Sequence, residues 1–292
     1  MNPGGPVSTA SVNPTVRRRR LGAELRKLRE QKGLTAEEVA QQLLVSQSKI
    51  SRLENGRRSI SQRDVRDLCT VYGVTDEGMV EGLMAMARES RQRGWWHAFG
   101  DLPYSVYIGL EAEASRMLTY ESLLIPGLLQ TRDYAAASVA GIEPDRDAEA
   151  VARRVDVRMR RQERIDGDKP LDLWVVMDEA ALTRVVGNKE IMREQLEHLL
   201  ELSERPHVNI QVLPFEAGAH PGMTGTFSII EFPESADTAV VYLEGVTSDL
   251  YLEKEAEVRR YTGLYTHLQA SALSTAESRA RIREKTKKEF SS

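Results

Sequence analysis

Two helical patterns separated by a very short connection constrain the fold of this chain more than any other feature of its sequence. Thr35 is followed three residues later by a glutamate, which is the spacing of a capping box at the start of a helix. Ser46 is a suitable N-cap for a second helix, and only Leu44 and Val45 separate it from the last apolar residue of the first. So short a connection forces the two helices to cross steeply.

Three further helical patterns surround this pair. Their apolar residues recur at three- and four-residue spacing, and they are predicted at residues 21–28, 61–71 and 75–86. The sequence therefore predicts an all-α N-terminal domain of five helices over residues 17–88, preceded by a disordered head at residues 1–16. Two helices joined by a tight turn in such a module have helix-turn-helix geometry, in which the second helix lies in the major groove of DNA.

The third predicted helix begins with polar side chains and few apolar anchors. Glutamine can form two hydrogen bonds with the edge of an adenine, and arginine can do the same with N7 and O6 of a guanine. We therefore predict that this stretch is a recognition helix, and that the base-reading residues are Gln47, Ser48, Ser51 and Arg52.

The charges of the chain are distributed unevenly. Residues 17–73 contain 14 Lys and Arg against 7 Asp and Glu, whereas the whole chain contains 40 against 44. The remainder therefore holds 26 basic and 37 acidic residues. A small basic module joined to a larger acidic region is expected of a nucleic-acid-binding protein, although charge alone is equally consistent with an ordinary basic surface.

The stretch LRKLREQKGLTAEEVAQQLLVSQSKISRLENGRRSIS resembles the Cro/phage-repressor (XRE) class of helix-turn-helix domain over residues 20–75. This resemblance implies a DNA-binding function. It also implies that the phosphate-contacting residues are Arg20, Thr35, Lys49, Asn55, Arg57 and Arg58, beside the base readers named above.

Two positions depart from the pattern of that class. Ala36 stands where many members have a glutamine that contacts a phosphate, and Leu44 stands where many have a glycine in the turn. If Leu44 keeps the left-handed conformation of that glycine, it costs about 1–2 kcal/mol, so a reshaped turn is the alternative.

The rest of the chain predicts an α+β domain with a small sheet over residues 109–283, followed by a tail at 284–292. Strand-like runs rich in β-branched residues lie at residues 171–177, 208–214, 226–232 and 239–245. Helical patterns lie at residues 110–122, 131–140, 148–165, 191–204 and 252–269. A sheet covered by helices is the expected architecture.

An aromatic segment at residues 89–108 joins the two predicted domains. One interpretation is an anchor that packs the linker against the second domain. The alternative is a surface that binds a ligand or partner, formed by Trp95, Trp96, Tyr104 and Tyr107.

The second half of the chain carries its own resemblance. The segments YIGLEAEASRMLTYESLLIPGLLQTRDYA, VMDEAALTRVVGNKEIMREQLEHLLE and VNIQVLPFEAGAHPGMTGTFSIIEF resemble the C-terminal domain of the actinobacterial WhiJ-like regulators. This resemblance implies an antitoxin-like protein that is paired with a small acidic protein encoded nearby.

No catalytic or metal site is predicted. The five histidines are scattered without H-E-x-x-H spacing, and no serine lies in a G-x-S-x-G motif. Asp178 and Glu179 follow a predicted strand and fit a cap for the next helix better than an acid/base pair. Residues 218–225, GAHPGMTG, lack the lysine of a phosphate-binding loop and are interpreted as a mobile hairpin loop.

Two arginine-rich stretches, residues 153–164 and 278–290, are interpreted as solvated helix faces. The alternatives are extra phosphate contacts for the first stretch and an oligomer or partner contact for the second.

The single cysteine, Cys69, excludes an intramolecular disulfide. No apolar run reaches the length of a membrane span, and no signal peptide is recognisable at the N-terminus. These features favour the cytoplasm, with association to the nucleoid when DNA is bound.

Together these features predict a non-enzymatic, sequence-specific transcriptional regulator without a cofactor or metal. It would bind a palindromic operator in double-stranded DNA as a homodimer, and its second domain would sense a partner protein or a small ligand. The alternative is an antitoxin-like interaction module that neutralises a small cognate protein and regulates its own operon. A ligand-dependent enzyme with a DNA-binding appendage is a third interpretation.

Overall fold

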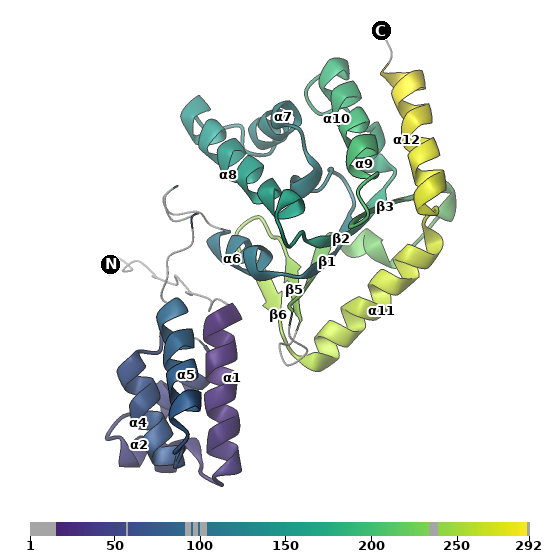
Figure 1. The fold of residues 1–292 in the computed structure, drawn as a ribbon. Coiled ribbons are helices and arrows are strands. Elements are labelled where there is room, and N and C mark those ends of the chain that lie inside the picture. Colours follow the sequence, from purple (N-terminus) through teal and green to yellow (C-terminus); the bar gives the residue numbers. More distant parts are fainter. Residues whose placement is uncertain are drawn as a thin grey trace, which may run out of the picture. The chain divides into compact units, whose positions relative to one another are not determined.

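A computed structural model describes residues 16–56, 58–90, 95, 99, 104–233 and 239–290. The chain divides into two compact units, residues 1–110 and 111–292. The first unit contains a helix-turn-helix region of five helices, and a domain with helices and a six-stranded mixed sheet follows it (Figure 1). This is the predicted fold class.

The N-terminal helices begin where the sequence places their caps. Thr35 forms the predicted capping box with Glu38, and the Ser46 hydroxyl accepts a hydrogen bond from the Lys49 amide. Ser61 forms a further capping box at the next helix. The five helices are α1 (Val16–Gln31), α2 (Ala36–Gln42), α3 (Gln47–Glu54), α4 (Gln62–Tyr72) and α5 (Glu77–Glu89).

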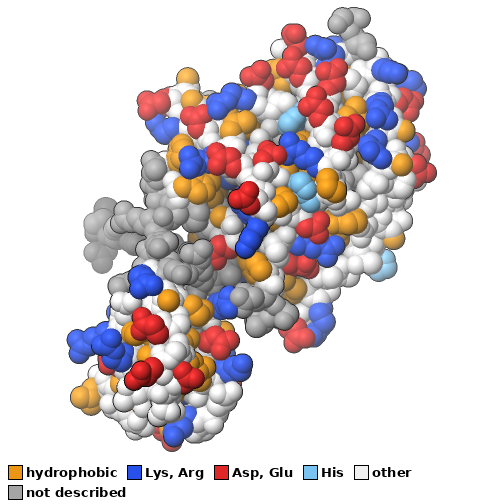
Figure 2. Space-filling model, viewed as in Figure 1, with side chains coloured by type: hydrophobic (Ala, Val, Ile, Leu, Met, Phe, Trp, Pro, Cys, Tyr) orange, Lys and Arg blue, Asp and Glu red, His pale blue; other side chains and the backbone are white. Residues whose placement is uncertain are grey.

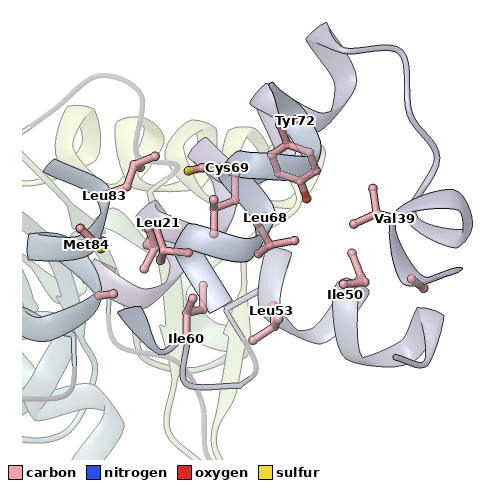
Figure 3. Close-up of a cluster of buried hydrophobic side chains, with 14 residues drawn as sticks. Leu21, Val39, Ile50, Leu53, Ile60, Leu68, Cys69, Tyr72, Leu83 and Met84 are labelled. Atoms are coloured by element: carbon pink, nitrogen blue, oxygen red, sulfur yellow. The ribbon is translucent and has the colours of Figure 1, made fainter. Parts of the chain in front are cut away.

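All five helices contribute to one hydrophobic core, which Figure 3 shows. Leu21 of α1, Val39 of α2, Ile50 of α3, Leu68 of α4 and Leu83 of α5 are buried in it. Because α2 and α3 are anchored by buried residues on one face only, their opposite faces are open to solvent.

The turn between α2 and α3 keeps the left-handed backbone conformation expected of a glycine at this position, although the residue is Leu44. Leu44 has a φ of 51° and is the one non-glycine residue with a positive φ in the part of the chain that the structure describes. Its side chain is 93% exposed. The turn is therefore not reshaped, and the leucine adopts an unfavourable backbone conformation without gaining apolar contacts.

The larger domain is built on a sheet with the strand order β3-β2-β1-β4-β5-β6. Strands β1, β2 and β3 run parallel, whereas β4 is antiparallel to β1, and β5 and β6 continue the antiparallel pairing. The strands are β1 (Arg116–Glu121), β2 (Asp172–Asp178), β3 (Val208–Leu213), β4 (Phe227–Glu231), β5 (Val240–Leu243) and β6 (Leu250–Leu252).

The prediction of a helix over residues 110–122 holds only for residues 110–113 and is wrong beyond them. Helix α6 (Ser105–Glu113) ends at Glu113, and β1 follows within three residues. Strand β1 lies between β2 and β4, and its four middle residues are all buried. A strand that is covered on both faces has no polar alternation, so its sequence cannot be distinguished by period from a buried helix.

Helices cover both faces of the sheet. Tyr265 and Leu268 of α11 (Glu255–Ser271) pack against one face, together with Tyr120, Phe227 and Val241 from the strands. Figure 1 shows α7 (Arg132–Ile142), α8 (Ala148–Asp166) and α10 (Lys189–Leu202) on the other side.

The last helix, α12 (Thr275–Glu289), is fastened to the sheet by a buried acid. Glu179 accepts hydrogen bonds from Arg281 at 2.9 Å and from the Phe215 amide at 3.1 Å, and Lys285 lies 3.2 Å from its other oxygen. Glu179 occupies the N-cap position of α9 (Ala180–Thr183), but its side chain makes no capping hydrogen bond there and joins α12 instead. Asp178 accepts a hydrogen bond from the Ala180 amide at 2.8 Å. Helix α12 also contains the first residues of the predicted tail.

Residues 214–226 connect β3 to β4 through the short 3-10 helices η3 (Phe215–Ala217) and η4 (Pro221–Thr224). The prediction of a hairpin at residues 218–225 is wrong, because β3 and β4 are not neighbours in the sheet. The connection has to pass over the ends of β2 and β1 instead.

Candidate DNA-recognition surface

The four predicted base-reading residues lie together at the exposed start and middle of α3. Gln47, Ser48, Ser51 and Arg52 are all exposed, whereas Ile50 and Leu53 on the opposite face are buried. The apolar anchors therefore hold one face of α3 in the core and present the polar residues as one surface.

Two hydrogen bonds order part of this surface. The Arg52 guanidinium donates through Nε to the Ser48 carbonyl at 3.0 Å and through Nη2 to the Ser48 hydroxyl at 3.1 Å. One turn further on, Asn55 donates to the Ser51 hydroxyl at 3.2 Å. Bonds to Ser48 restrict the rotamers of Arg52, which reduces the entropy that a base contact would cost.

Lys49 has a partner that the sequence did not predict. Its ammonium lies 3.0 Å from Asp64 Oδ1, and both side chains are about one quarter exposed. Burial raises the pKa of Asp64, but hydrogen bonds from Ser61 and Lys49 outweigh it, so the pKa lies below its ordinary value. The ion pair joins α3 to α4, and Lys49 has to share its charge between Asp64 and any phosphate.

The other predicted phosphate contacts have different surroundings. The Thr35 hydroxyl donates to Glu38 Oε2 at 2.8 Å within the capping box, and Asn55 and Arg58 are exposed. Arg20 is half-buried, and Arg57 lies outside the described residues. None of these roles is tested by the structure, and all of them stay predictions.

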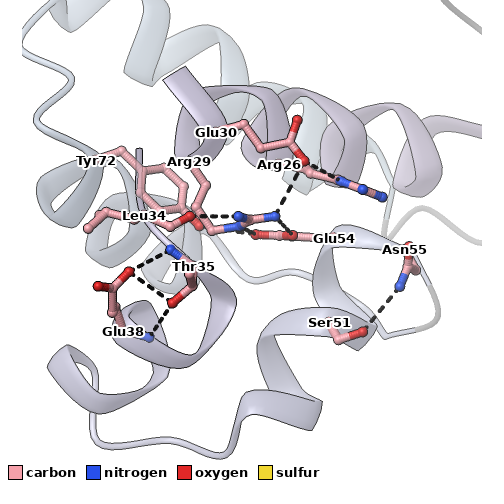
Figure 4. Close-up of polar contacts among 10 residues, drawn as sticks. All are labelled: Arg26, Arg29, Glu30, Leu34, Thr35, Glu38, Ser51, Glu54, Asn55 and Tyr72. Carbon is pink, nitrogen blue, oxygen red and sulfur yellow. Dashed lines mark hydrogen bonds and ion pairs between the residues drawn. The ribbon is translucent and has the colours of Figure 1, made fainter. Parts of the chain in front are cut away.

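A buried network supports α3 from behind, as Figure 4 shows. Arg29 donates to both oxygens of Glu54, at 2.7 and 3.0 Å, and to the Leu34 carbonyl at 2.7 Å. The Tyr72 hydroxyl lies 3.4 Å from Glu54 Oε1. The hydrogen bond with Glu54 raises the pKa of Arg29, and burial followed by the charge of Glu54 raises the pKa of Tyr72. This network joins α1, α3, α4 and the start of α2.

Sequence reasoning missed this network because 25 residues separate Arg29 from Glu54. The available signal was the spacing of Glu54, which stands four residues after the apolar Ile50 and therefore on the same face of the helix. In the structure Glu54 is 7% exposed. A buried carboxylate requires a charged partner.

Glycines allow α1 to approach the end of α3 closely. A Cβ at Gly22 would lie 2.4 Å from the Glu54 carbonyl oxygen and 2.7 Å from that of Leu53. Gly56 follows α3 with a φ of 62°, and a Cβ there would lie 2.8 Å from the Arg19 Cα. The orientation of α3 therefore depends on backbone contacts that a larger residue would break.

The aromatic segment is only partly described. Trp95, Tyr104 and Tyr107 are half-buried, and the rings of Trp95 and Phe99 pack edge to face at 5.9 Å. Trp96 lies outside the described residues. Both interpretations of the segment, as an anchor and as a binding surface, stay predictions.

The arginine-rich stretch of α8 is engaged within its own domain. Arg161 forms a two-point hydrogen bond with the buried Glu111, at 2.7 and 2.7 Å, and Arg158 donates to Gln130 at 2.6 Å. Arg164 donates to the Ala114 carbonyl at 2.7 Å. Three of the six arginines of the stretch therefore hold α8 within its own domain. Figure 2 shows charges of both signs interspersed over the visible face of the larger unit.

Among the described residues, no helix is both long enough and apolar enough to cross a bilayer. Within the same residues, no group of three or more His, Cys, Asp or Glu side chains is arranged to hold a metal ion.

Comparisons with known proteins agree with the two-part organisation. Residues 20–81 match the model of a helix-turn-helix domain, HTH_31. The chain is similar to the crystal structure of the clp gene regulator ClgR from C. glutamicum, with 32% sequence identity and a TM-score of 0.22. The match covers 28% of this chain and 100% of that chain. At so low a TM-score, the likeness says nothing further about the fold. No curated protein matches the chain.

The larger domain matches a second family model, described as a domain of unknown function, DUF5753, over residues 104–284. None of these matches names the WhiJ-like regulators or the XRE class, so both resemblances stay predictions. The match to the second model spans more than half of the chain, and the chain therefore belongs to the DUF5753 family.

Proposed function

We propose that this protein is a sequence-specific transcriptional regulator that reads double-stranded DNA with α3 and acts as a cytoplasmic homodimer. The observation that carries the proposal is the exposed polar face of α3, which follows α2 after only four residues within the matched helix-turn-helix region. A helix presented in this way fits the major groove, where each base pair has a distinct pattern of donors and acceptors.

In this proposal Gln47, Ser48, Ser51 and Arg52 contact base edges. Gln47 lies at the first position of α3 and is free of the bonds that hold Arg52, so it can adapt to an adenine. Arg52 is oriented by Ser48 and suits a guanine. Arg20, Thr35, Lys49, Asn55, Arg57 and Arg58 contact phosphates, which set the register without reading sequence.

Selection of bound sites from random DNA with the full-length protein tests the proposal. Replacing Gln47 or Arg52 by Ala should weaken binding to the selected site by about 1–3 kcal/mol and relax the preference at one base position. Gln31→Ala, at the exposed end of α1, is the matched control. It should change neither the affinity for the selected site nor the base preference. If Gln47→Ala weakens selected and random DNA equally, the base-reading role is wrong.

The phosphate contacts are tested through salt. Arg58→Ala should weaken selected and random DNA alike, and it should reduce the slope of log K against log salt by about one unit. An unchanged slope would exclude Arg58 from the phosphate contacts.

The homodimer follows from the size of a half-site. One recognition helix reads only a few base pairs, so useful specificity requires two modules about one helical turn apart on a palindromic operator. A symmetric dimer through residues 90–292 is the simplest source of that spacing. Light scattering at micromolar concentration should give twice the monomer mass of 32.8 kDa. A monomer both free and on DNA would contradict the dimer.

The larger domain is proposed to receive the regulatory input. It accounts for most of the chain, and no contact within it is required to complete the core of the N-terminal helices. An effector that binds there would change operator affinity through a coupling free energy between the two sites.

A further inference from the structure

The carboxyl ends of the parallel strands gather chemically reactive side chains that the proposed DNA-binding function does not use. Strand β1 ends with Tyr120 and Glu121, and the neighbouring β2 ends with Asp178. In open sheets with parallel strands, ligands bind outside these carboxyl ends. The β3–β4 connection crosses the same edge and brings His220 over it.

Two polar atoms at this edge are buried without a hydrogen-bond partner among the described residues. They are the Tyr120 hydroxyl and His220 Nδ1. Tyr120 is 0% exposed, and the His220 side chain is 10% exposed. The two rings pack edge to face with their centroids 6.0 Å apart. Buried donors and acceptors are rarely left unpaired, because their desolvation is not compensated.

The other nitrogen of His220 is oriented by an acid. Nε2 lies 3.3 Å from Asp178 Oδ2, and Asp178 is itself fixed by the Ala180 amide at 2.8 Å. In the tautomer whose proton lies on Nε2 and faces the carboxylate, Nδ1 is a hydrogen-bond acceptor. Burial, and then the charges of Asp178 and Glu121, raise the pKa of Tyr120, so its hydroxyl stays protonated and is a donor.

The segment above these atoms packs directly on them. A Cβ at Gly222 would lie 2.4 Å from Tyr120 Cζ and 2.8 Å from its hydroxyl oxygen. Only a residue without a side chain allows this approach. The flanking Gly218 and Gly225 have φ values of 66° and 133°. A ligand therefore reaches the two unpaired atoms only when residues 221–225, which follow His220, move away from the sheet.

We propose that Tyr120 and His220 form the polar floor of a small-molecule site at the carboxyl edge of the sheet, closed by residues 221–225. The floor offers one donor and one acceptor, so its ligand carries one acceptor and one donor. Aromatic rings supply an apolar wall. The ring centroid of Phe227 lies 6.0 Å from that of Tyr120 and 5.0 Å from that of Tyr261. The adjacent Asp178 carboxylate disfavours anions. The ligand class is a neutral amide or alcohol on an apolar frame.

The first test compares two buried tyrosines in the full-length protein. Tyr120→Phe removes an unpaired hydroxyl and should raise the melting temperature of the larger domain by about 2–4 °C. Tyr265→Phe removes a hydroxyl that donates to the Trp174 carbonyl at 3.0 Å, and it should lower the melting temperature instead. If Tyr120→Phe lowers it as Tyr265→Phe does, the Tyr120 hydroxyl already has a partner and the site is overturned.

The second test measures binding of benzamide, a neutral aromatic amide, by ligand-observed NMR titration. Benzamide should bind the wild-type protein, and Tyr120→Phe should weaken it about tenfold, whereas Tyr265→Phe should not. Benzoate, with the same frame but a negative charge, should not bind. No binding of benzamide, equal binding to the Tyr120→Phe protein, or equal binding of benzoate would overturn the proposal.

The regulatory meaning of this site rests on the proposed function, but its existence does not. Both measurements are made without DNA, so the site can fail while α3 still reads DNA. Conversely, a failure of the Gln47 and Arg52 variants would leave the benzamide result unchanged.

Discussion

Arg29 on α1 and Glu54 at the end of α3 form a two-point ion pair, with Nε and Nη2 at 2.7 and 3.0 Å from the carboxylate oxygens. The side chains are only 11% and 5% exposed. The pair therefore fixes the recognition helix against the first helix from within the protein, at a place where neither charge can return to water without unfolding.

Removing one member of this pair should cost far more than removing both. Arg29→Met or Glu54→Leu alone leaves a buried charge without a partner, and each should lower the free energy of unfolding by about 3–5 kcal/mol. The double variant should recover much of that loss. Urea denaturation of the full chain measures the free energy of unfolding of each variant. The control is Arg26→Met in the exposed Arg26–Glu30 pair, whose free energy of unfolding should lie within about 1 kcal/mol of wild type. Additive losses in the double variant would contradict the pairing.

Leu44 should be replaceable with a gain in stability. Its φ of 51° is unfavourable for a leucine, and its exposed side chain has little contact to lose. Leu44→Gly should therefore stabilise the N-terminal domain by about 1 kcal/mol in thermal denaturation. The control is Leu43→Gly, since Leu43 has a φ of −91° and packs against the core, and this change should destabilise. A loss of stability in Leu44→Gly would show that its side chain has a role in the fold.

Two glycines in helices should respond to alanine in opposite directions. Gly22→Ala places a Cβ against backbone carbonyls at the end of α3, and it should destabilise by about 1–3 kcal/mol. Gly82→Ala in α5 meets nothing within 4 Å, and it should stabilise by about 0.5–1 kcal/mol through helix propensity. Denaturation curves of the two variants measure the change in the free energy of unfolding. A stabilisation by both substitutions would contradict the close approach of α1 and α3. Gly22→Ala should also weaken operator binding, because α3 has to shift.

The stability of the larger domain should fall as pH rises through neutrality. Burial, and then the charge of Glu244, raise the pKa of Glu121 to about 8, partly offset by Arg158. A carboxyl whose pKa rises on folding holds a proton in the folded state between its unfolded pKa and about 8, so stability is lost across that window.

Glu121→Gln should remove this dependence. The variant and the wild type should be similar near pH 4.5, and above pH 8 the variant should be more stable by at least about 1.4 kcal/mol, which is the value of one pKa unit. Glu244→Gln should reduce the slope without abolishing it, since burial remains. Melting temperatures from pH 4.5 to 9 provide the measurement. Parallel curves for Glu121→Gln and wild type would show that Glu121 ionises as it does in water.

The N-terminal helices could be predicted from the sequence because their signals are local. The caps at Thr35, Ser46 and Ser61 satisfy amides within three residues, and the apolar spacing marks the buried face of each helix. The polar face of α3 follows from the same spacing. The turn at Leu44 was also identified, although only the structure decided between strain and a reshaped turn.

The interactions that tertiary structure alone decided join residues far apart in the chain. Arg29 meets Glu54 across 25 residues, Arg161 meets Glu111 across 50, and Arg281 meets Glu179 across 102. The sequence of β1 predicts a helix because burial on both faces removes the polar alternation of a strand. Tyr120 and His220 come together only because the β3–β4 connection crosses the edge of the sheet. Local sequence determines which residues a helix buries, whereas long-range packing determines which charges and unpaired atoms it buries beside one another.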